Sequence, residues 1–429
     1  MTDRAAGSAR NIAWASYLRT YGLWVLAAVV IFALPHVFDS RANQSMLGQM
    51  GIFVVFALSY NMLLGQSGML SFGHAVYFGF AGFISVHVMR IIESGFAFPV
   101  VLLPLFGAAA GLALGIIFGS FSTRRAGTVF AMITLGIAEL VGALAFFIGF
   151  FGGEEGISGD RMSGPSLPGL SLGPQIQVYY VIAAWTLVAA LLMYAITRTP
   201  LGRMANAVRD NPERAEFIGY STQRVRFLMF SLSGMFAGVA GALFAIQFEF
   251  LQFNNIGVAA SGSVLLMTFI GGVGFFMGPI LGAILVTFLE LELVNVTQAW
   301  LLYFGLFFVL MVMFVPTGLA GLIMRHQPIW RAGILHKLAP AYGLALVPSL
   351  IFAVGAIGLI EIIYFTSTRA GLNTVMSVYT ITFDAVKPLP WIIAGIVAAG
   401  GFALCRLTFP TVRKVWDEVF LEAMAKLNR

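Results

Sequence analysis

The 429-residue sequence has few of the groups on which soluble enzymes depend. Only 10% of its residues are charged, while 59% are hydrophobic, and its one cysteine is Cys405. A single cysteine excludes an internal disulfide, and its place in an apolar run predicts a small hydrophobic packing residue. So little charge in so apolar a chain argues against a soluble globular domain and predicts a polytopic membrane protein.

Motifs for nucleotide binding, metal binding and catalysis are also missing from the sequence. No G-x-x-x-x-G-K-[ST] segment occurs, so we do not expect the chain to bind ATP through a phosphate-binding loop. None of the five histidines pairs with another histidine or with Cys405 at a metal-ligand spacing. No serine stands out as a nucleophile with a nearby base. We therefore expect no catalytic activity, no cofactor and no metal in this chain.

Apolar runs long enough to cross a bilayer make up most of the sequence. We predict spans at residues 21–38, 46–64, 72–88, 100–121, 127–150, 178–196, 227–246, 263–291, 300–315, 343–364 and 391–407. The run 263–291 is long for one span, and its glycines and Pro279 indicate a hairpin of two helices. The expected fold is therefore an all-α polytopic membrane protein with about ten to twelve transmembrane helices and glycine-broken hairpins.

The net charge of +6 is best explained by membrane topology. The positive residues are concentrated in loops that hydropathy places in the cytoplasm, so they indicate orientation and give no reason to expect nucleic-acid binding. Residues 1–19 contain three arginines and no small-residue cleavage pattern, which predicts a cytoplasmic tail and not a removed signal peptide. An even number of crossings then leaves both termini in the cytoplasm.

The longest strongly charged segment between apolar runs is residues 197–226. Within it, Asn211 is placed to cap a helix, and Pro212 occupies the first helical position, where proline is well tolerated. Glu213 and Glu216 follow near the positive end of that helix, and Gly219 is a natural stop. A short capped helix between two spans is a shape that can dock into another protein; an ordinary solvated loop is the plainer interpretation.

Two stretches of closely spaced glycines predict close helix contacts within the membrane. Gly111, Gly115 and Gly119 recur every four residues and therefore lie on one helix face, while Gly234 and Gly238 have the same spacing. Small residues let helix backbones approach closely in lipid. We expect both faces to pack against other helices.

Glycine-rich breaks at residues 65–74 and 271–278 interrupt two apolar runs. Non-helical backbone near membrane depth is tolerated where protein or a water-filled cavity covers it, so both breaks are candidates for a translocation path. His74 either lines a gate or is a buried, hydrogen-bonded histidine. Glu139, near the middle of a span, would cost about 3 kcal/mol in lipid, so it either faces the path or fixes helix packing. The candidate path or gate residues are Gly68, Ser71, His74, Glu139, Gly272 and Gly274.

The charged segment resembles the coupling loop of LivM-type permeases from branched-chain amino-acid ABC importers, with the pattern SPxGRAxxAIRDxxxxAxxxG. The matching residues are Pro200, Gly202, Arg203, Ala207, Arg209, Asp210, Ala215 and Gly219. The segments NMLLGQSGMLSFGHAVYFGFAGF, RAGTVFAMITLGIAEL, GGEEGISG, SGSVLLMTFIGGVGFFMGPILGA and FVPTGLAGL also resemble the family, in the family's order. Several ordered matches make the resemblance specific between residues 44 and 322.

The resemblance implies a role and a set of partners. It implies a permease subunit in the bacterial inner membrane that imports branched-chain amino acids or a related small polar solute, such as urea, an amide or an aromatic acid. It implies a second homologous permease, two ABC ATPases that bind the ATP, and a periplasmic substrate-binding protein. The residues expected to contact the ATPase are Arg209, Asp210, Asn211, Glu213, Arg214, Ala215, Glu216 and Gly219.

The chain departs from this family pattern at its C-terminus. Family members end soon after the position of Leu322, whereas this chain continues to residue 429. We therefore divide it into a tail (1–19), a permease domain (20–322) and an extension (323–429) with two extra spans and an amphipathic helix. Two rivals remain: an ion-coupled secondary transporter, which would leave the capped loop unexplained, and a membrane scaffold that transports nothing.

Overall fold

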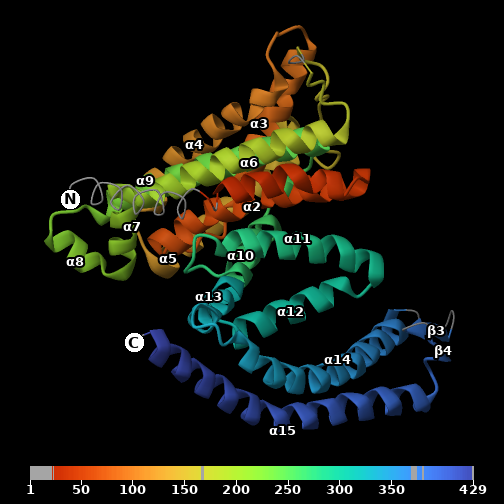
Figure 1. The fold of residues 1–429 in the computed structure, drawn as a ribbon. Helices are drawn as coiled ribbons and strands as arrows, with labels where there is room; N and C mark the ends of the chain where they lie inside the picture. The colour runs from red at the N-terminus through yellow and green to blue at the C-terminus, as the bar shows by residue number, and fades with distance from the viewer. Residues whose placement is uncertain (1–21, 23, 166–168, 369–373, 379–380, 428–429) are drawn as a thin grey trace. The chain divides into compact units, whose positions relative to one another are not determined.

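The computed structural model describes residues 22, 24–165, 169–368, 374–378 and 381–427, and these are predominantly helical. Ten helices among them are long and apolar enough to cross a membrane. Their α-helical parts are α2 (Arg41–Ser67), α3 (Ala75–Glu93), α4 (Leu103–Ser122), α5 (Gly127–Phe147), α6 (Gln175–Arg198), α9 (Thr222–Phe248), α10 (Val258–Gly271), α11 (Gly278–Val296), α14 (Ala339–Thr368) and α15 (Pro388–Leu427). The spans of α4, α10 and α14 begin earlier, at Val100, Phe253 and Leu335, because each includes a preceding 3-10 turn. The prediction of an all-α polytopic membrane protein is confirmed (Figure 1).

Three further apolar helices lie among the described residues. The bent pair α12 (Trp300–Phe314) and α13 (Gly318–Arg331), with an angle of 44° between its members, counts as an eleventh span if taken together. A shorter apolar helix covers Trp24–Val37 within the first predicted span. The predicted break in the run 263–291 is also present, because α10 ends at Gly271 and α11 begins at Gly278.

The described chain forms two compact units. The first contains the residues up to Leu293 together with Leu306–Gly321, and the second contains Val294–Gly305 and Leu322–Arg429. All of the candidate coupling and path residues fall in the first unit. The boundary between the predicted permease domain and the extension remains a prediction.

Glycine faces hold the first unit together at the contact between α4 and α9. A Cβ on Gly111 would meet the carbonyl oxygen of Gly234, and one on Gly107 would meet that of Gly238. A Cβ on Gly115 would lie 2.9 Å from the Cα of Ser231. The predicted glycine faces therefore do pack closely, and they pack against each other.

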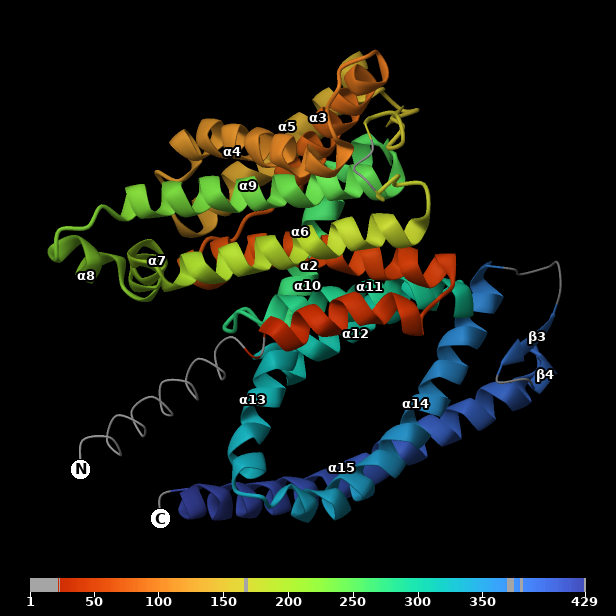
Figure 2. The ribbon, with the colours of Figure 1, turned by 45° about the horizontal axis from the view of Figure 1, so that its top comes forward.

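The ends of the first unit differ in structure. One end carries a short antiparallel pair, β1 (Ile157–Ser158) with β2 (Phe250–Leu251), which joins the loop after α5 to the end of α9. The opposite end carries α7 (Pro200–Asp210) and α8 (Pro212–Phe217), which project past the ends of α6 and α9 in both ribbon views (Figures 1 and 2). Since α6 leads into α7 and α8 leads into α9, this end is where the predicted coupling segment lies.

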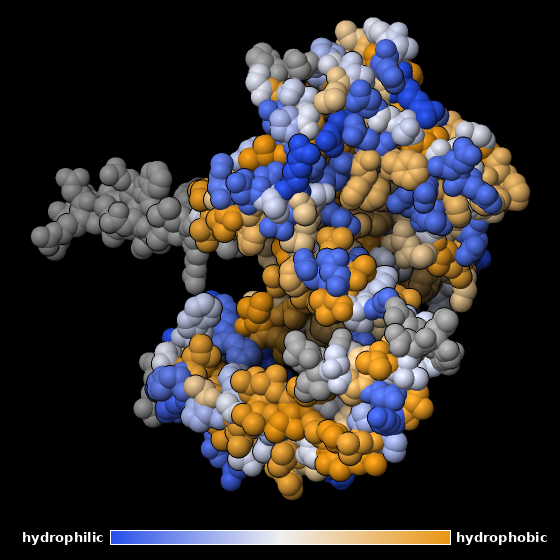
Figure 3. All heavy atoms as spheres, turned by 90° about the vertical axis from the view of Figure 1, so that its right-hand side faces the viewer, coloured by the Kyte–Doolittle hydropathy of each residue, from blue (hydrophilic) through white to orange (hydrophobic). Residues whose placement is uncertain are grey.

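The longest elements of the second unit are the helices α14 and α15, and the antiparallel strands β3 (Val375–Val378) and β4 (Ile381–Asp384) lie between them in the chain. The part of Figure 3 that shows these helices is largely hydrophobic, as expected for surfaces that face lipid. The C-terminal amphipathic helix was expected to follow the last span as an element of its own. It is instead the continuation of α15, which runs unbroken for 40 residues with Pro410 inside it.

Candidate coupling element and translocation path

The coupling element consists of α7 and α8, and local sequence signals define both helices. Thr199 caps α7 by accepting a hydrogen bond from the Gly202 amide, and Pro200 takes the first helical position. Asn211 caps α8, its Oδ1 accepting from the Arg214 amide at 2.9 Å, and Pro212 again follows the cap. The predicted N-cap is therefore confirmed.

The end of α8 also has the predicted conformation. Gly219 has a φ of +93°, a left-handed conformation that favours glycine, and no atom lies within 4 Å of the position of its missing Cβ. Ser221 then caps α9 by accepting from the Arg224 amide. Glu216 accepts a hydrogen bond from the Thr222 hydroxyl at 2.6 Å, which ties α8 to the first turn of α9. The whole element is thus a defined structure and not a loose loop.

Most of the residues that the family resemblance assigns to ATPase contact lie on the surface of this element. The exposed ones are Arg209, Asp210, Asn211, Glu213, Arg214, Glu216 and Gly219. Ala215 differs, because it is only 3% exposed and lies inside the element. Whether the exposed residues contact a partner remains a prediction.

Two apolar residues that our sequence reasoning did not select dominate the tip of α8. Phe217 is 90% exposed and Ile218 is 65% exposed. An exposed aromatic side chain on a short rigid helix is typical of a protein-binding surface. The signal was visible in the sequence as an aromatic residue within an otherwise charged segment.

Arg209 is placed differently from the other predicted contact residues. Its Nη1 donates to the backbone carbonyl of Gly65, the third-last residue of α2, and its Nε donates to Asp210 Oδ1 at 2.9 Å. One turn earlier on α7, Asn206 Nδ2 donates to Gln66 Oε1 at 3.0 Å. The structure therefore brings the predicted coupling segment into direct contact with the predicted break at residues 65–74.

That break folds back into the core of the first unit. Gly68 ends α2 with a φ of +68°, and α3 begins at Ala75. Ser71 is fully buried, and its carbonyl accepts from the Tyr60 hydroxyl at 2.9 Å. His74 Nε2 lies 2.9 Å from Ser59 Oγ in a buried hydrogen bond.

Aromatic rings enclose His74 on several sides. Phe56 stacks on its imidazole with ring centroids 5.5 Å apart, and the Tyr60 ring meets it edge-on at 5.2 Å. Of the two interpretations of His74, the structure shows the buried, hydrogen-bonded one. A polar path past this residue would require these rings to move.

The second break, between α10 and α11, lies against the end of α2. Gly272 has a φ of +111°, and a Cβ there would meet the carbonyl oxygen of Thr317. A Cβ on Gly65 would lie 2.6 Å from the carbonyl oxygen of Val273. Gly274, by contrast, has open space around it. The two predicted breaks thus meet at Gly65, the same residue that Arg209 contacts.

Glu139 lies on the exposed face of α5. With Phe146, Asn254 and Gly257 it lines a groove of about 310 Å³ between α5 and the start of α10. Among the described residues, none forms a hydrogen bond or ion pair with its carboxylate. The structure therefore does not supply the packing hydrogen bond that was one interpretation of this residue.

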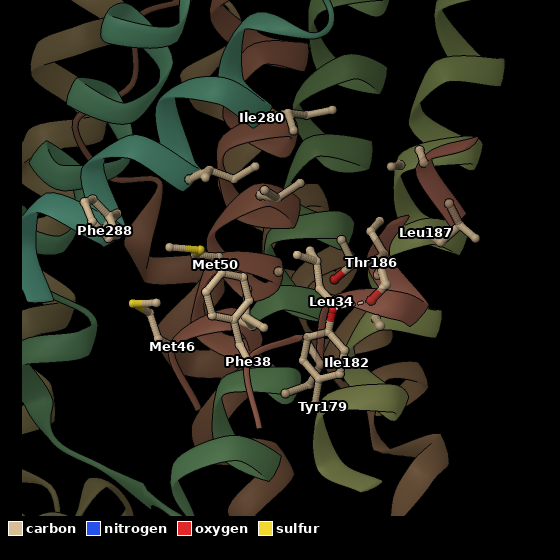
Figure 4. Close-up of a pocket in the computed structure, with 18 of the residues that line it drawn as sticks. Leu34, Phe38, Met46, Met50, Tyr179, Ile182, Thr186, Leu187, Ile280 and Phe288 are labelled. Carbon is tan, nitrogen blue, oxygen red and sulfur yellow. Dashed lines mark hydrogen bonds between the residues drawn. The ribbon is translucent and has the colours of Figure 1, made fainter. Parts of the chain in front are cut away.

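A larger cavity in the first unit is apolar. It has a volume of about 570 Å³ and lies between the Trp24–Val37 helix, α2, α6 and α11. Leu34, Met50, Ile182 and Thr186 are among the side chains that surround it (Figure 4). None of the described residues that line this cavity is charged, so it does not provide the ionic contacts that a zwitterionic solute requires.

Comparison with known proteins places these features in a family. The family described as "Branched-chain amino acid transport system / permease component" matches residues 44–316. The high-affinity branched-chain amino acid transport system permease protein LivM of Salmonella typhimurium is 27% identical over 322 residues, covering 69% of this chain and 74% of that protein. LivM of Escherichia coli is 28% identical over 320 residues, covering 68% of this chain and 74% of that protein.

A relative named for a different solute matches over a similar region. The autoinducer 2 import system permease protein LsrC of Salmonella paratyphi B is 30% identical over 293 residues, covering 63% of this chain and 77% of that protein. No solved structure matches the chain significantly. The family match covers the coupling element, both breaks and Glu139, and it stops before α13. The chain therefore belongs to the branched-chain amino acid permease family and is a multi-pass membrane subunit of an ABC-type transporter.

Proposed function

We propose that this chain is one of two permease subunits of an importer in the bacterial inner membrane, with both termini in the cytoplasm. It would carry branched-chain amino acids or a related small polar solute inward, as a periplasmic binding protein delivers them. ATP would be bound and hydrolysed by two partner ATPases, and the chain itself would hold no cofactor. The family and the LivM relatives, which are branched-chain amino acid permeases, support this proposal.

The observation that carries the proposal is the projecting tip of α8. Phe217 and Ile218 are 90% and 65% exposed, at the end of the first unit that carries α7 and α8. Exposed charges from Glu213 and Arg214 flank these side chains. An apolar centre with a charged rim is the usual composition of a binding hot spot, so this tip is proposed as the ATPase contact.

The proposed path for the solute runs along the face of α5 that carries Glu139. The Glu139 carboxylate has no partner among the described residues, and such a group is costly in lipid. Contact with an aqueous path or with another subunit removes that cost. We propose that the second permease covers this face and that Glu139 lines the passage between the two subunits. The apolar cavity beside α6 is not part of this path.

The ATPase contact can be tested by changing Phe217 to serine. Truncating a central aromatic contact typically costs 2 kcal/mol or more, so we expect co-purification of the ATPases to fall about thirtyfold or more. The matched control is Phe96→Ser, which changes another exposed aromatic residue. Phe96 is 52% exposed and lies just after the C-terminal end of α3. Full ATPase recovery with Phe217→Ser would refute this assignment.

A further inference from the structure

The inner face of the coupling element is built to fit the last turn of α2. Ala205 and Val208 are 0% and 2% exposed, so this face of α7 is packed and unavailable to a partner protein. On the same side of the element, Asn206 bonds Gln66 and Arg209 bonds the Gly65 carbonyl. The tip and the inner face of the element therefore have different contacts.

The Gly65 carbonyl is a site that attracts a cation. It belongs to the last turn of α2, where carbonyl groups lack helical partners and the helix dipole is negative. The amide of Met69, which would have completed the helical pattern, donates instead to the Leu63 carbonyl at 3.0 Å. The Arg209 guanidinium thus supplies a charge-assisted donor from a different helix.

Gly68 makes room for the stem of the same arginine. Its φ of +68° is left-handed, and a Cβ there would lie 2.8 Å from Arg209 Cγ. Asp210 holds the other side of the guanidinium, with Arg209 Nη2 2.9 Å from Asp210 Oδ1. Head and stem of Arg209 are therefore both positioned against the end of α2.

Gly65 also lies against the loop between α10 and α11. The Val273 carbonyl oxygen lies so close to Gly65 that a Cβ on this glycine would be only 2.6 Å from that oxygen. A displacement of α7 that moves the end of α2 must therefore also act on the loop at residues 272–277. Close-packed backbone contacts of this kind transmit displacement because they cannot be compressed.

We propose that Arg209 is a positioning residue that transmits the movement of α7 and α8 to the two glycine breaks, and that it does not serve as an ATPase contact. This inference rests on the proposed function. It separates two tasks within one element: the tip of α8 binds the partner, and the inner face of α7 transmits its movement. The family resemblance alone had grouped Arg209 with the contact residues.

The test uses the assembled complex and two readouts. Arg209→Gln removes the charge while keeping much of the stem, and Arg209→Lys keeps a cation without the fork geometry. Arg224→Gln, at an exposed arginine in the first turn of α9, is the charge-matched control. The first readout is the amount of ATPase that co-purifies. The second is hydrogen exchange across residues 62–74, with and without ATP and vanadate.

The wild type and the Arg224→Gln control should show a change in exchange at residues 62–74 when ATP and vanadate are added. Arg209→Gln should retain its ATPases within about twofold but lose most of that change, about tenfold or more in exchange rate, because the coupling free energy is removed. Arg209→Lys should restore this exchange response in part.

Loss of the ATPases from Arg209→Gln, as from Phe217→Ser, would make Arg209 a docking residue and overturn the proposal. An unaltered exchange response would overturn it equally. A wild-type chain without ATPases would instead refute the proposed function.

Discussion

Gly219 shows how a single residue sets the shape of the coupling element. Its φ of +93° lies where a β-branched residue is strongly disfavoured, and the space around it is open, so only the backbone conformation restricts it. We expect Gly219→Val to cost about 1–3 kcal/mol of local stability and to lower transport by the assembled complex. Uptake into proteoliposomes measures this effect.

The control for this prediction is Gly219→Asn, because asparagine tolerates the left-handed conformation. It should retain most of the uptake. Equal activity of the valine and asparagine variants would show that the conformation of Gly219 is not needed for coupling.

Glu139 gives a second prediction at the scale of one residue. Because its carboxylate lies on an exposed face of α5 and has no partner among the described residues, Glu139→Leu should not destabilise the isolated chain. It should nevertheless lower uptake by about tenfold if the residue lines a polar path. Thermal stability in detergent and uptake of labelled leucine separate the two effects. A large loss of stability with normal uptake would restore the structural interpretation.

The conformation of a residue was predicted well wherever it depends only on its neighbours in the sequence. Asn211 and Gly219 follow from the preferences of helix ends, which need no knowledge of the rest of the fold. The contact between Arg209 and Gly65 joins residues 144 positions apart, and no periodicity in the sequence indicates it. Phe217 was missed because our sequence reasoning selected the capping, charged and family-matching residues of this segment, and Phe217 is none of these.

At the scale of helices, the packing of α4 on α9 leads to a stability prediction. Gly111→Leu would force a side chain into the backbone of Gly234, so the helices must separate. Overpacking of this kind costs about 1–3 kcal/mol or more. Gly136→Leu is the matched control, because nothing lies within 4 Å of a Cβ at that position on α5. Only the first variant should lower the melting temperature of the purified chain, and equal melting temperatures would contradict the packing described here.

Helix boundaries followed hydropathy except at the C-terminus. The predicted last span ends near residue 407 because the apolar run ends there, yet α15 continues to Leu427. Hydropathy indicates which residues lie in lipid, whereas a helix continues for as long as its backbone hydrogen bonds are maintained, in lipid or in water. Pro410 lacks an amide hydrogen and is compatible with a bend, but it does not by itself end a helix that packing supports. Val419 and Ala423 in the continuation do pack against Ile329, Ile334 and Leu338.

At the scale of the whole molecule, the second compact unit joins residues 294–305, inside the family match, to residues beyond it. Glu361 on α14 accepts hydrogen bonds from the Thr297 hydroxyl at 2.7 Å and from the Tyr303 hydroxyl at 3.0 Å. Hydrogen bonds to a charged acceptor are worth about 1.5–3 kcal/mol each. We therefore expect Glu361→Ala to increase hydrogen exchange across residues 294–305, while Glu361→Gln, which keeps an acceptor oxygen, has a smaller effect. Unchanged exchange in the alanine variant would show that these bonds do not hold the segment.

The central claim is that this chain works as part of a larger ATP-driven assembly through the coupling element. The most direct measurement is purification of the tagged chain from its own host in mild detergent, followed by mass spectrometry of the proteins that accompany it. The account predicts two ATPases with phosphate-binding loops and a second, homologous permease. Recovery of the chain alone, or only of further copies of itself, under conditions that preserve known transporter complexes would contradict it.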